Sequence, residues 1–160
     1  MAVDARQVFT RPDYFIACGF GSGLVPRAPG TAGSALGLVL FLPAIGLPIV
    51  VQIGLVVMGL VFGIYISNRV AAEIGTKDPA AIVWDEFIGM WIAMLWLPDL
   101  YWLPVAFVLF RLFDIVKPWP VSWADRDLEG GLGIMLDDVI AGLLALGSLQ
   151  LLFYAYLQFL

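Results

Sequence analysis

The sequence contains no histidine, a single cysteine (Cys18) and few charged residues. The lack of histidine excludes histidine-based acid–base catalysis, phosphohistidine chemistry and histidine-ligated zinc. One cysteine rules out an intramolecular disulfide, so cysteine usage indicates no redox compartment. Charged residues make up 13% of the chain and hydrophobic residues 62%, against about 25% and about 45–50% in soluble globular chains. These proportions predict an integral membrane protein.

The net charge is −5, from eight basic and 13 acidic residues. No basic patch is available to neutralise a phosphate backbone, so we do not expect a nucleic-acid partner. Residues 1–15 carry acids and have no apolar core, so no cleaved signal peptide is expected. Nine of the 21 charged residues lie between Arg111 and Asp138, inside otherwise apolar sequence. Charge in such surroundings is costly unless it has a function or a partner.

The apolar stretches predict an all-α fold, a small membrane-embedded bundle of about four to five apolar helices that forms one domain over residues 1–160. A spanning helix needs about 20 residues. Pro12 and Asp13 are expected to open a short interfacial helix. The spacing of Gly59 and Gly63 permits close helix packing and leaves the oligomeric state open. The expected apolar segments are 32–46, 48–67, 82–97, 102–117 and 135–158, with a polar connection at 68–81 and a loop rich in Trp, Pro and Gly at 118–134.

The positions of lysine and arginine predict the topology. The connections at 43–48 and 98–101 contain neither residue, whereas all the basic residues fall at the opposite ends of the expected segments. The positive-inside rule makes that face cytoplasmic, so we expect a multi-pass protein of the bacterial cytoplasmic (inner) membrane with its active-site loops facing the cytoplasm. The basic residues are Arg6, Arg11, Arg27, Arg69, Lys77, Arg111, Lys117 and Arg126.

Two pairs of adjacent acids are expected to begin helices on that same face. Acids in a first helical turn interact favourably with the helix dipole, so either pair alone is compatible with a simple helix start. Two pairs together, with Asp114 near the end of another helix, favour a metal site instead. Clustered carboxylates without His or Cys prefer a hard cation, and Mg²⁺ is the leading candidate. The predicted metal ligands are Asp85, Glu86, Asp137 and Asp138.

Arg111, Asp114 and Lys117 follow one another at three-residue intervals before Pro118, which is expected to end their helix. Arginine binds phosphate through a bidentate fork, and lysine acts as a point charge. The alternative is that both cations simply reach the lipid headgroups.

Residues 17–34, ACGFGSGLVPRAPGTAGS, are rich in glycine and end in Thr31 and Ser34. If a helix starts just after this stretch, its backbone N–H groups and hydroxyls can hold an anion. The alternative is a turn between two helices in which Thr31 or Ser34 is the N-cap.

Three segments, GFGSGLVPRAPGTAGS (19–34), IVWDEFIGMWI (82–92) and RLFDIVKPWPVSWADRDLEGGLGIMLDDVIAG (111–142), closely resemble the phosphatidylglycerophosphatase A family. They occur in the right order and cover most of residues 16–142. The resemblance implies Mg²⁺-dependent hydrolysis of the lipid phosphatidylglycerophosphate to phosphatidylglycerol and phosphate, in phospholipid synthesis at the inner face of the membrane.

Residue types and resemblance together assign expected roles. Asp125 is an alternative to Asp114 for completing or orienting the metal ligands. Attack by water and a covalent route with Asp85 or Asp138 as nucleophile both remain open. The expected catalytic residues are Asp85, Glu86, Asp114, Lys117 and Asp138. The expected substrate-binding residues are Thr31, Ser34, Arg111 and Arg126.

Three other functions are alternatives. A different Mg²⁺-dependent lipid-headgroup enzyme, such as a CDP-alcohol phosphotransferase, would carry an aspartate-rich D-x2-D-G-x2-A-R pattern, which the chain lacks. An ion-coupled transporter needs polar groups near mid-membrane, whereas the acids here are expected at helix starts. A structural subunit, in which the acids serve only as caps, is a third alternative.

Overall fold

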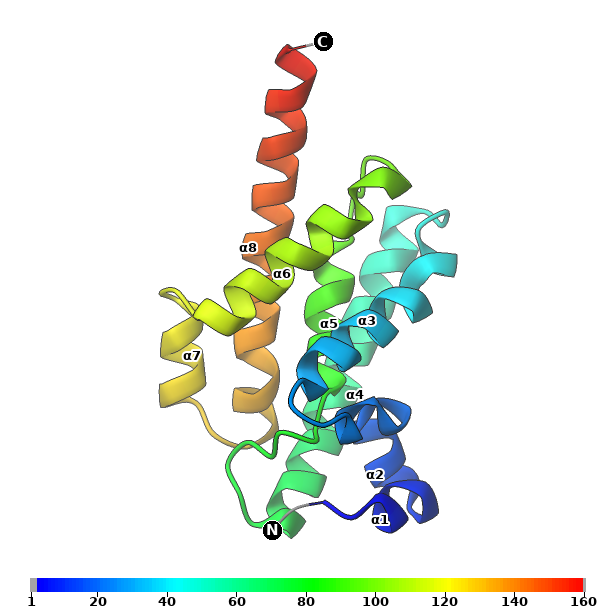
Figure 1. The fold of residues 1–160 in the computed structure, drawn as a ribbon, viewed down its shortest axis with the longest axis vertical. Helices are drawn as coiled ribbons and strands as arrows, with labels where there is room; N and C mark the ends of the chain where they lie inside the picture. The colour runs from blue at the N-terminus through cyan, green and yellow to red at the C-terminus, as the bar shows by residue number, and fades with distance from the viewer. Residues whose placement is uncertain (1–2, 160) are drawn as a thin grey trace.

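The computed structural model describes residues 3–159, and all the regular elements in that range are helices. Figure 1 shows them as a bundle from which the end of α8 protrudes. Three short 3₁₀ helices, η1 (Gly19–Leu24), η2 (Leu42–Ala44) and η3 (Leu100–Trp102), join the longer elements. The α-helices are α1 (Ala5–Thr10), α2 (Pro12–Ala17), α3 (Pro29–Phe41), α4 (Ile49–Ile74), α5 (Trp84–Ala93), α6 (Leu103–Val116), α7 (Val121–Asp127) and α8 (Gly130–Gln158).

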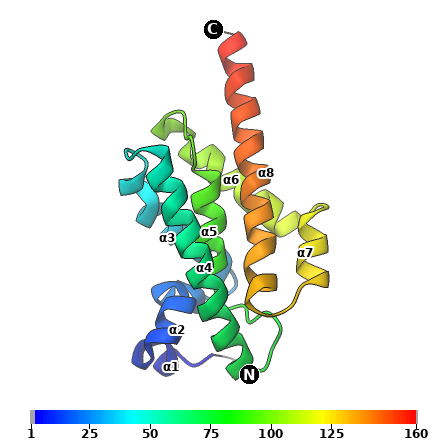
Figure 2. The same cartoon turned by 180° about the vertical axis from the view of Figure 1, so that it is seen from behind.

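Helix α5 is the centre of the bundle. Eight of its ten residues are buried, and it is in contact with α3, α4, α6 and α8 (Figures 1 and 2). Ten residues span only about 15 Å. A helix that is apolar on nearly all sides must be enclosed by others, and α5 therefore sets where its neighbours lie.

The backbones of α5 and α8 are in direct contact at Gly89 and Gly142. A Cβ atom on Gly142 would lie 2.5 Å from the carbonyl oxygen of Gly89, and one on Gly89 would lie 2.7 Å from the carbonyl oxygen of Asp138. Only glycine allows the two backbones to meet in this way. The contact brings Asp138 to the first turn of α5.

Gly59 and Gly63 of α4 pack inside the chain. A Cβ atom on Gly59 would meet Ile88, and one on Gly63 would meet Trp84. The indole N–H of Trp84 donates to the Gly59 carbonyl at 3.0 Å. These glycines therefore serve the α4–α5 contact, and their spacing is no indication of an oligomer.

Several predicted boundaries were wrong. Helix α4 continues to Ile74 and ends at Gly75 in the left-handed conformation, so residues 68–74 are helical and not part of a polar connection. Helix α1 was not predicted, and the expected loop 118–134 contains α7 and the start of α8. The interfacial helix expected from Pro12 is α2.

Two corrections concern the candidate site. Helix α8 begins at Gly130, so Asp137 and Asp138 lie about two turns inside it and not in its first turn. Helix α3 begins at Pro29 with Ala28 as N-cap, so neither Thr31 nor Ser34 is a cap. The helix-start explanation for Asp137 and Asp138 therefore fails.

Two helices, α4 and α8, are long and apolar enough to cross a membrane. Helices α5 and α6, with 10 and 14 residues, would reach about 15 and 21 Å, less than the ~30 Å hydrocarbon core. The predicted segments 82–97 and 102–117 are thus too short as helices to span a membrane alone.

The α5–α8 contact predicts that Gly142→Val destabilises the protein, because the new side chain must displace the α5 backbone. We expect the free energy of unfolding to fall by about 3 kcal/mol, measured by thermal unfolding of the purified protein in detergent. Gly147→Val is the matched control, because a Cβ atom there meets nothing within 4 Å. Equal stability of the two variants would contradict the packing described here.

Candidate active site

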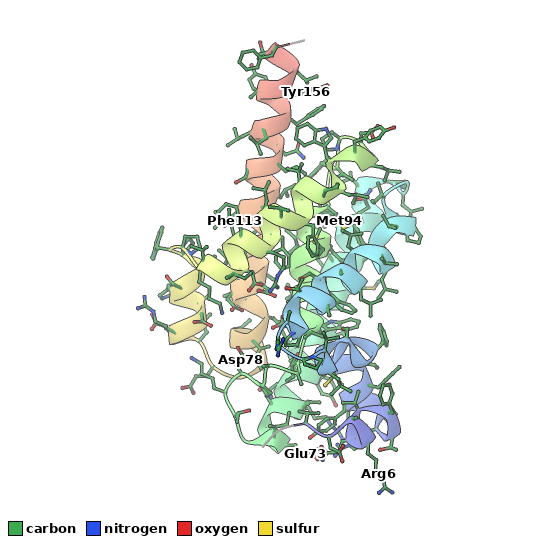
Figure 3. The ribbon with its side chains drawn as sticks, viewed as in Figure 1. Arg6, Glu73, Asp78, Met94, Phe113 and Tyr156 are labelled. Carbon is green, nitrogen blue, oxygen red and sulfur yellow. The ribbon has the colours of Figure 1, made fainter. Side chains whose placement is uncertain are left out.

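A cavity of about 220 Å³ lies where the start of α3, the start of α5, the end of α6 and the interior of α8 meet. The connection between α4 and α5 completes it through Asp78, which Figure 3 labels. Its walls contain six acidic residues and two basic ones. Two cations cannot balance so many carboxylates. The charged lining residues are Asp78, Asp85, Glu86, Asp114, Asp137, Asp138, Arg111 and Lys117.

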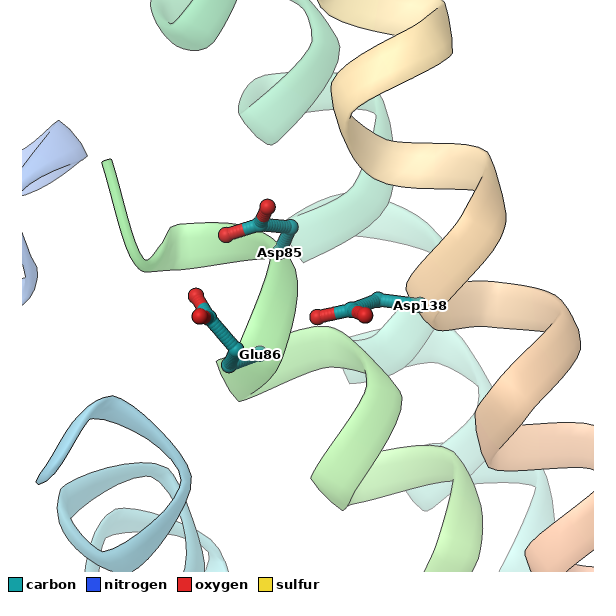
Figure 4. A group of neighbouring side chains, drawn as sticks. All are labelled: Asp85, Glu86 and Asp138. Carbon is teal, nitrogen blue, oxygen red and sulfur yellow. The ribbon is translucent and has the colours of Figure 1, made fainter. Parts of the chain in front are cut away.

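Three of the carboxyl groups converge. Oxygen atoms of Asp85, Glu86 and Asp138 all lie within 4.8 Å of one another, and Figure 4 shows them meeting between α5 and α8. Asp85 is 8% exposed and Asp138 3%. Each of the three acids has a buried oxygen with no hydrogen-bond partner in residues 3–159: Asp85 Oδ1, Glu86 Oε2 and Asp138 Oδ2.

This cluster fits a divalent cation. Buried carboxylate oxygens without donors are costly, and a hard cation such as Mg²⁺ takes oxygen ligands of this kind. The three acids come from two helices whose backbones are in contact at Gly89 and Gly142, so they are held by rigid elements. The structure therefore offers three candidate ligands for one ion.

Asp137 is engaged differently from its neighbour. Its Oδ2 accepts a hydrogen bond from Lys117 Nζ at 2.8 Å, and the same ammonium group donates to Asp125 Oδ1 at 2.6 Å. The other oxygen of Asp137, Oδ1, is buried without a partner among the described residues. Asp137 thus lines the cavity while it holds Lys117, and it lies outside the three-carboxylate cluster.

Arg111 is held in place by two neighbours. It forms an ion pair with Asp114, and its Nη1 donates to Ser34 Oγ at 3.2 Å. The Ser34 hydroxyl in turn donates to the Gly30 carbonyl at 2.8 Å. Arg111 Nε has no acceptor in the described part of the chain. Arg111 thus lines the cavity with one guanidinium donor that has no partner among these residues.

Gly30 forms the wall opposite Glu86. A Cβ atom at this position would collide with Glu86 Oε1 and lie 3.2 Å from the Arg111 guanidinium nitrogens. Gly30 belongs to the first turn of α3, a helix that has no side-chain cap. The positive end of the α3 dipole is therefore at the cavity. The sequence analysis had expected a helix start only after Ser34, whereas α3 begins inside the glycine-rich stretch.

Other predicted site residues do not line the cavity. Ser34 is fully buried and contacts Arg111 instead. Thr31 is absent from the cavity walls. Arg126 is exposed, and its Nε donates to the Ser122 carbonyl at 3.0 Å. The roles of Thr31 and Arg126 in substrate binding stay predictions.

Asp78 was missed by the sequence analysis. It precedes Pro79 in a polar connection, a position that is typical of a helix boundary. Nothing in the sequence indicates that this connection folds over the cavity. Removal of water by the surrounding protein raises the pKa of its carboxyl group.

The chain matches known proteins over most of its length. The family model of phosphatidylglycerophosphatase A matches residues 15–153. A phosphatidylglycerophosphatase A of Escherichia coli (strain K12) is 42% identical over 147 residues, which cover 91% of this chain and 86% of the relative. One of Haemophilus influenzae is 44% identical over 138 residues, 84% of each chain.

A protein of Bacteroides thetaiotaomicron is 41% identical over 144 residues, 82% of this chain and 89% of its own length, and carries the provisional name phosphatidylinositol-3-phosphatase. No solved structure matches the chain.

The carboxylate cluster predicts divalent-ion binding that depends on two helices. Asp85→Asn and Asp138→Asn should each weaken Mn²⁺ binding at least about tenfold, because each removes a charged ligand. The measurement is the free Mn²⁺ signal in electron paramagnetic resonance with purified protein. Asp127→Asn, on the exposed end of α7, is the control and should bind normally. Unchanged affinity in both cluster variants would rule out this site.

Proposed function

The chain belongs to the phosphatidylglycerophosphatase A family, and we propose that it is a Mg²⁺-dependent membrane phosphatase. Its reaction converts phosphatidylglycerophosphate to phosphatidylglycerol and phosphate. The observation that carries the proposal is the cavity in which three unpaired carboxylates converge next to the free donor of Arg111. A divalent cation would offset part of the negative charge of these carboxylates and would allow an anionic phosphate group to enter the site.

Exposed apolar side chains support a position within the membrane. Large hydrophobic residues are exposed along α4, for example Val50 at 77% and Met58 at 64%, and near the end of α8, for example Leu151 at 72%. In water such surfaces would be unfavourable, whereas lipid tails would cover them. We propose that α4 and α8 cross the inner membrane and that the shorter helices pack beside them.

The distribution of charge supports an orientation. Arg6 and Glu73 lie at one end of the molecule and Tyr156 at the other (Figure 3). Arg69 lies one turn before Glu73 in the last part of α4, and Lys77 lies in the connection that follows this helix. We propose that the cavity opens on the cytoplasmic side, at headgroup depth, where a lipid phosphate can enter.

The proposed roles follow from the contacts. Asp85, Glu86 and Asp138 hold Mg²⁺, which when bound supplies positive charge that polarises the phosphoryl group. Arg111 binds a phosphoryl oxygen through Nε and stabilises the charge that develops as the ester bond breaks. Backbone N–H groups at the start of α3 bind a second oxygen.

The attacking group is proposed in two forms. Water can attack phosphorus directly and displace phosphatidylglycerol, whose ester oxygen takes up a proton. Alternatively, the carboxylate of Asp85 or Asp138 can attack first and displace phosphatidylglycerol, and water then hydrolyses the resulting acyl phosphate to restore the carboxylate and release phosphate. Inversion of configuration at a chiral phosphorus supports direct attack by water, and a trapped phosphoprotein supports the covalent route.

The name of the Bacteroides relative supports a second candidate substrate. Phosphatidylinositol 3-phosphate also presents a phosphate monoester on a phospholipid headgroup, and 41% identity over most of both chains makes it a fair comparison. Its larger inositol ring would have to fit the same cavity of about 220 Å³.

We expect the purified protein to release phosphate from phosphatidylglycerophosphate in detergent micelles, with at least about tenfold lower activity toward phosphatidylinositol 3-phosphate. A chelator should abolish release, and added Mg²⁺ should restore it. Asp85→Asn and Asp138→Asn should reduce kcat at least about 100-fold, whereas Asp127→Asn should not. Release that is unaffected by the chelator would refute the Mg²⁺ dependence.

Ser34 is expected to act on catalysis through Arg111. Ser34→Ala should lower kcat about tenfold, because the guanidinium group loses the acceptor that positions it, while Mn²⁺ affinity stays normal. Ser22→Ala is the matched control, since the Ser22 hydroxyl also donates to a backbone carbonyl, that of Gly19, at 2.8 Å, but does not contact Arg111. Equal activities of the two variants would show that Ser34 has no positioning role.

A further inference from the structure

A second groove adjoins the cavity. It has a volume of about 570 Å³ and lies between residues 23–29 and the connection 76–81. The groove and the cavity share three lining residues, Pro29, Asp78 and Ala80. A molecule bound in the cavity can therefore extend into the groove without crossing the protein interior.

The groove has a rigid wall. A Cβ atom on Gly23 would collide with the carbonyl oxygen of Ala81, so the two segments are in direct backbone contact. Pro26 and Pro29 restrict the chain on either side of Arg27, and Arg27 itself has a φ of 70°, a conformation that is uncommon for a residue other than glycine. The position of Arg27 is thus fixed by its neighbours.

Among the described residues that line the groove, two are charged: Arg27 and Asp78. The Arg27 side chain is exposed and forms no ion pair or hydrogen bond within residues 3–159. Leu24 and Val25, the latter 43% exposed, supply an apolar wall beside it. A free guanidinium group next to apolar surface suits an anionic group that continues into a hydrocarbon portion.

The proposed substrate has such a group. Phosphatidylglycerophosphate carries a terminal phosphate monoester and, three carbons away across a glycerol unit, an internal phosphate diester that leads to the acyl chains. If the monoester lies against Arg111 in the cavity, the diester must lie just outside it. We propose that Arg27 binds this internal phosphodiester and so helps to select lipids that carry two phosphates. This inference rests on the proposed function.

The test distinguishes binding of the terminal phosphate monoester from binding of the internal phosphodiester. Arg27→Gln should raise KM for phosphatidylglycerophosphate about tenfold, because it removes one charged hydrogen-bond donor. It should leave kcat unchanged, and it should leave unchanged the inhibition constant of inorganic phosphate, which occupies the cavity alone. The KM of Arg27→Lys should lie between the KM of the wild-type protein and that of Arg27→Gln. Arg6→Ala, which removes an exposed arginine of α1 that does not line the groove, is the matched control and should match the wild-type protein.

Two results would overturn the inference. One is an unchanged KM in Arg27→Gln. The other is an equal rise in KM and in the inhibition constant of phosphate, which would mean that Arg27 acts on the cavity or through general surface charge. If the wild-type protein releases no phosphate from this lipid, the proposed function fails. The role of Arg27 is then tested by equilibrium binding of the lipid and of inorganic phosphate to the same variants. Arg27→Gln should bind the lipid more weakly and inorganic phosphate as tightly as the wild-type protein.

Discussion

The candidate site depends on the contact between the backbones of α5 and α8. Gly89 and Gly142 let the two helices approach until a methyl group would not fit between them. Because Asp138 lies one turn before Gly142 on α8, this approach delivers its carboxyl group to the first turn of α5. Asp138 thereby meets Asp85 and Glu86, which lie more than 50 positions earlier in the sequence. Any residue larger than glycine at the contact would separate them.

So many carboxyl groups in one cavity are unfavourable in a protein that binds no cation there. Six carboxyl groups surround two cations, and several of the carboxylate oxygens are buried without donors. Like charges that are held close in a poorly hydrated site repel each other strongly. The repulsion has to be overcome by the packing of α5 among its neighbours, and a bound cation would relieve it. Ion binding and the stability of the bundle should therefore be linked, as for any ligand that binds only the folded state.

The features of the fold that depend on local sequence signals were predicted correctly. Asp85 and Glu86 were predicted correctly at a helix start, since an apolar run begins there after a proline-containing connection. The start of α8 could not be predicted, because Gly130, Gly131 and Gly133 are poor helix formers. Gly131 is held there because Asn68 of α4 accepts a hydrogen bond from its N–H at 3.0 Å and the α4 backbone leaves no room for a side chain at this position. Such tertiary contacts leave no pattern in a single sequence, and the same holds for Ser34 and Asp78.

The two lysines, Lys77 and Lys117, connect α7 to the rest of the bundle. Lys117 lies just after α6 in the left-handed conformation and joins Asp125 of α7 to Asp137 of α8. Lys77 donates to the backbone carbonyls of Asp125 and Arg126 at 3.0 and 2.8 Å. Helix α7 is thus attached at one end through two ammonium groups, one of which also lines the cavity. A phosphate in the cavity would compete with Asp125 and Asp137 for Lys117, and this side chain would then couple substrate binding to the position of α7.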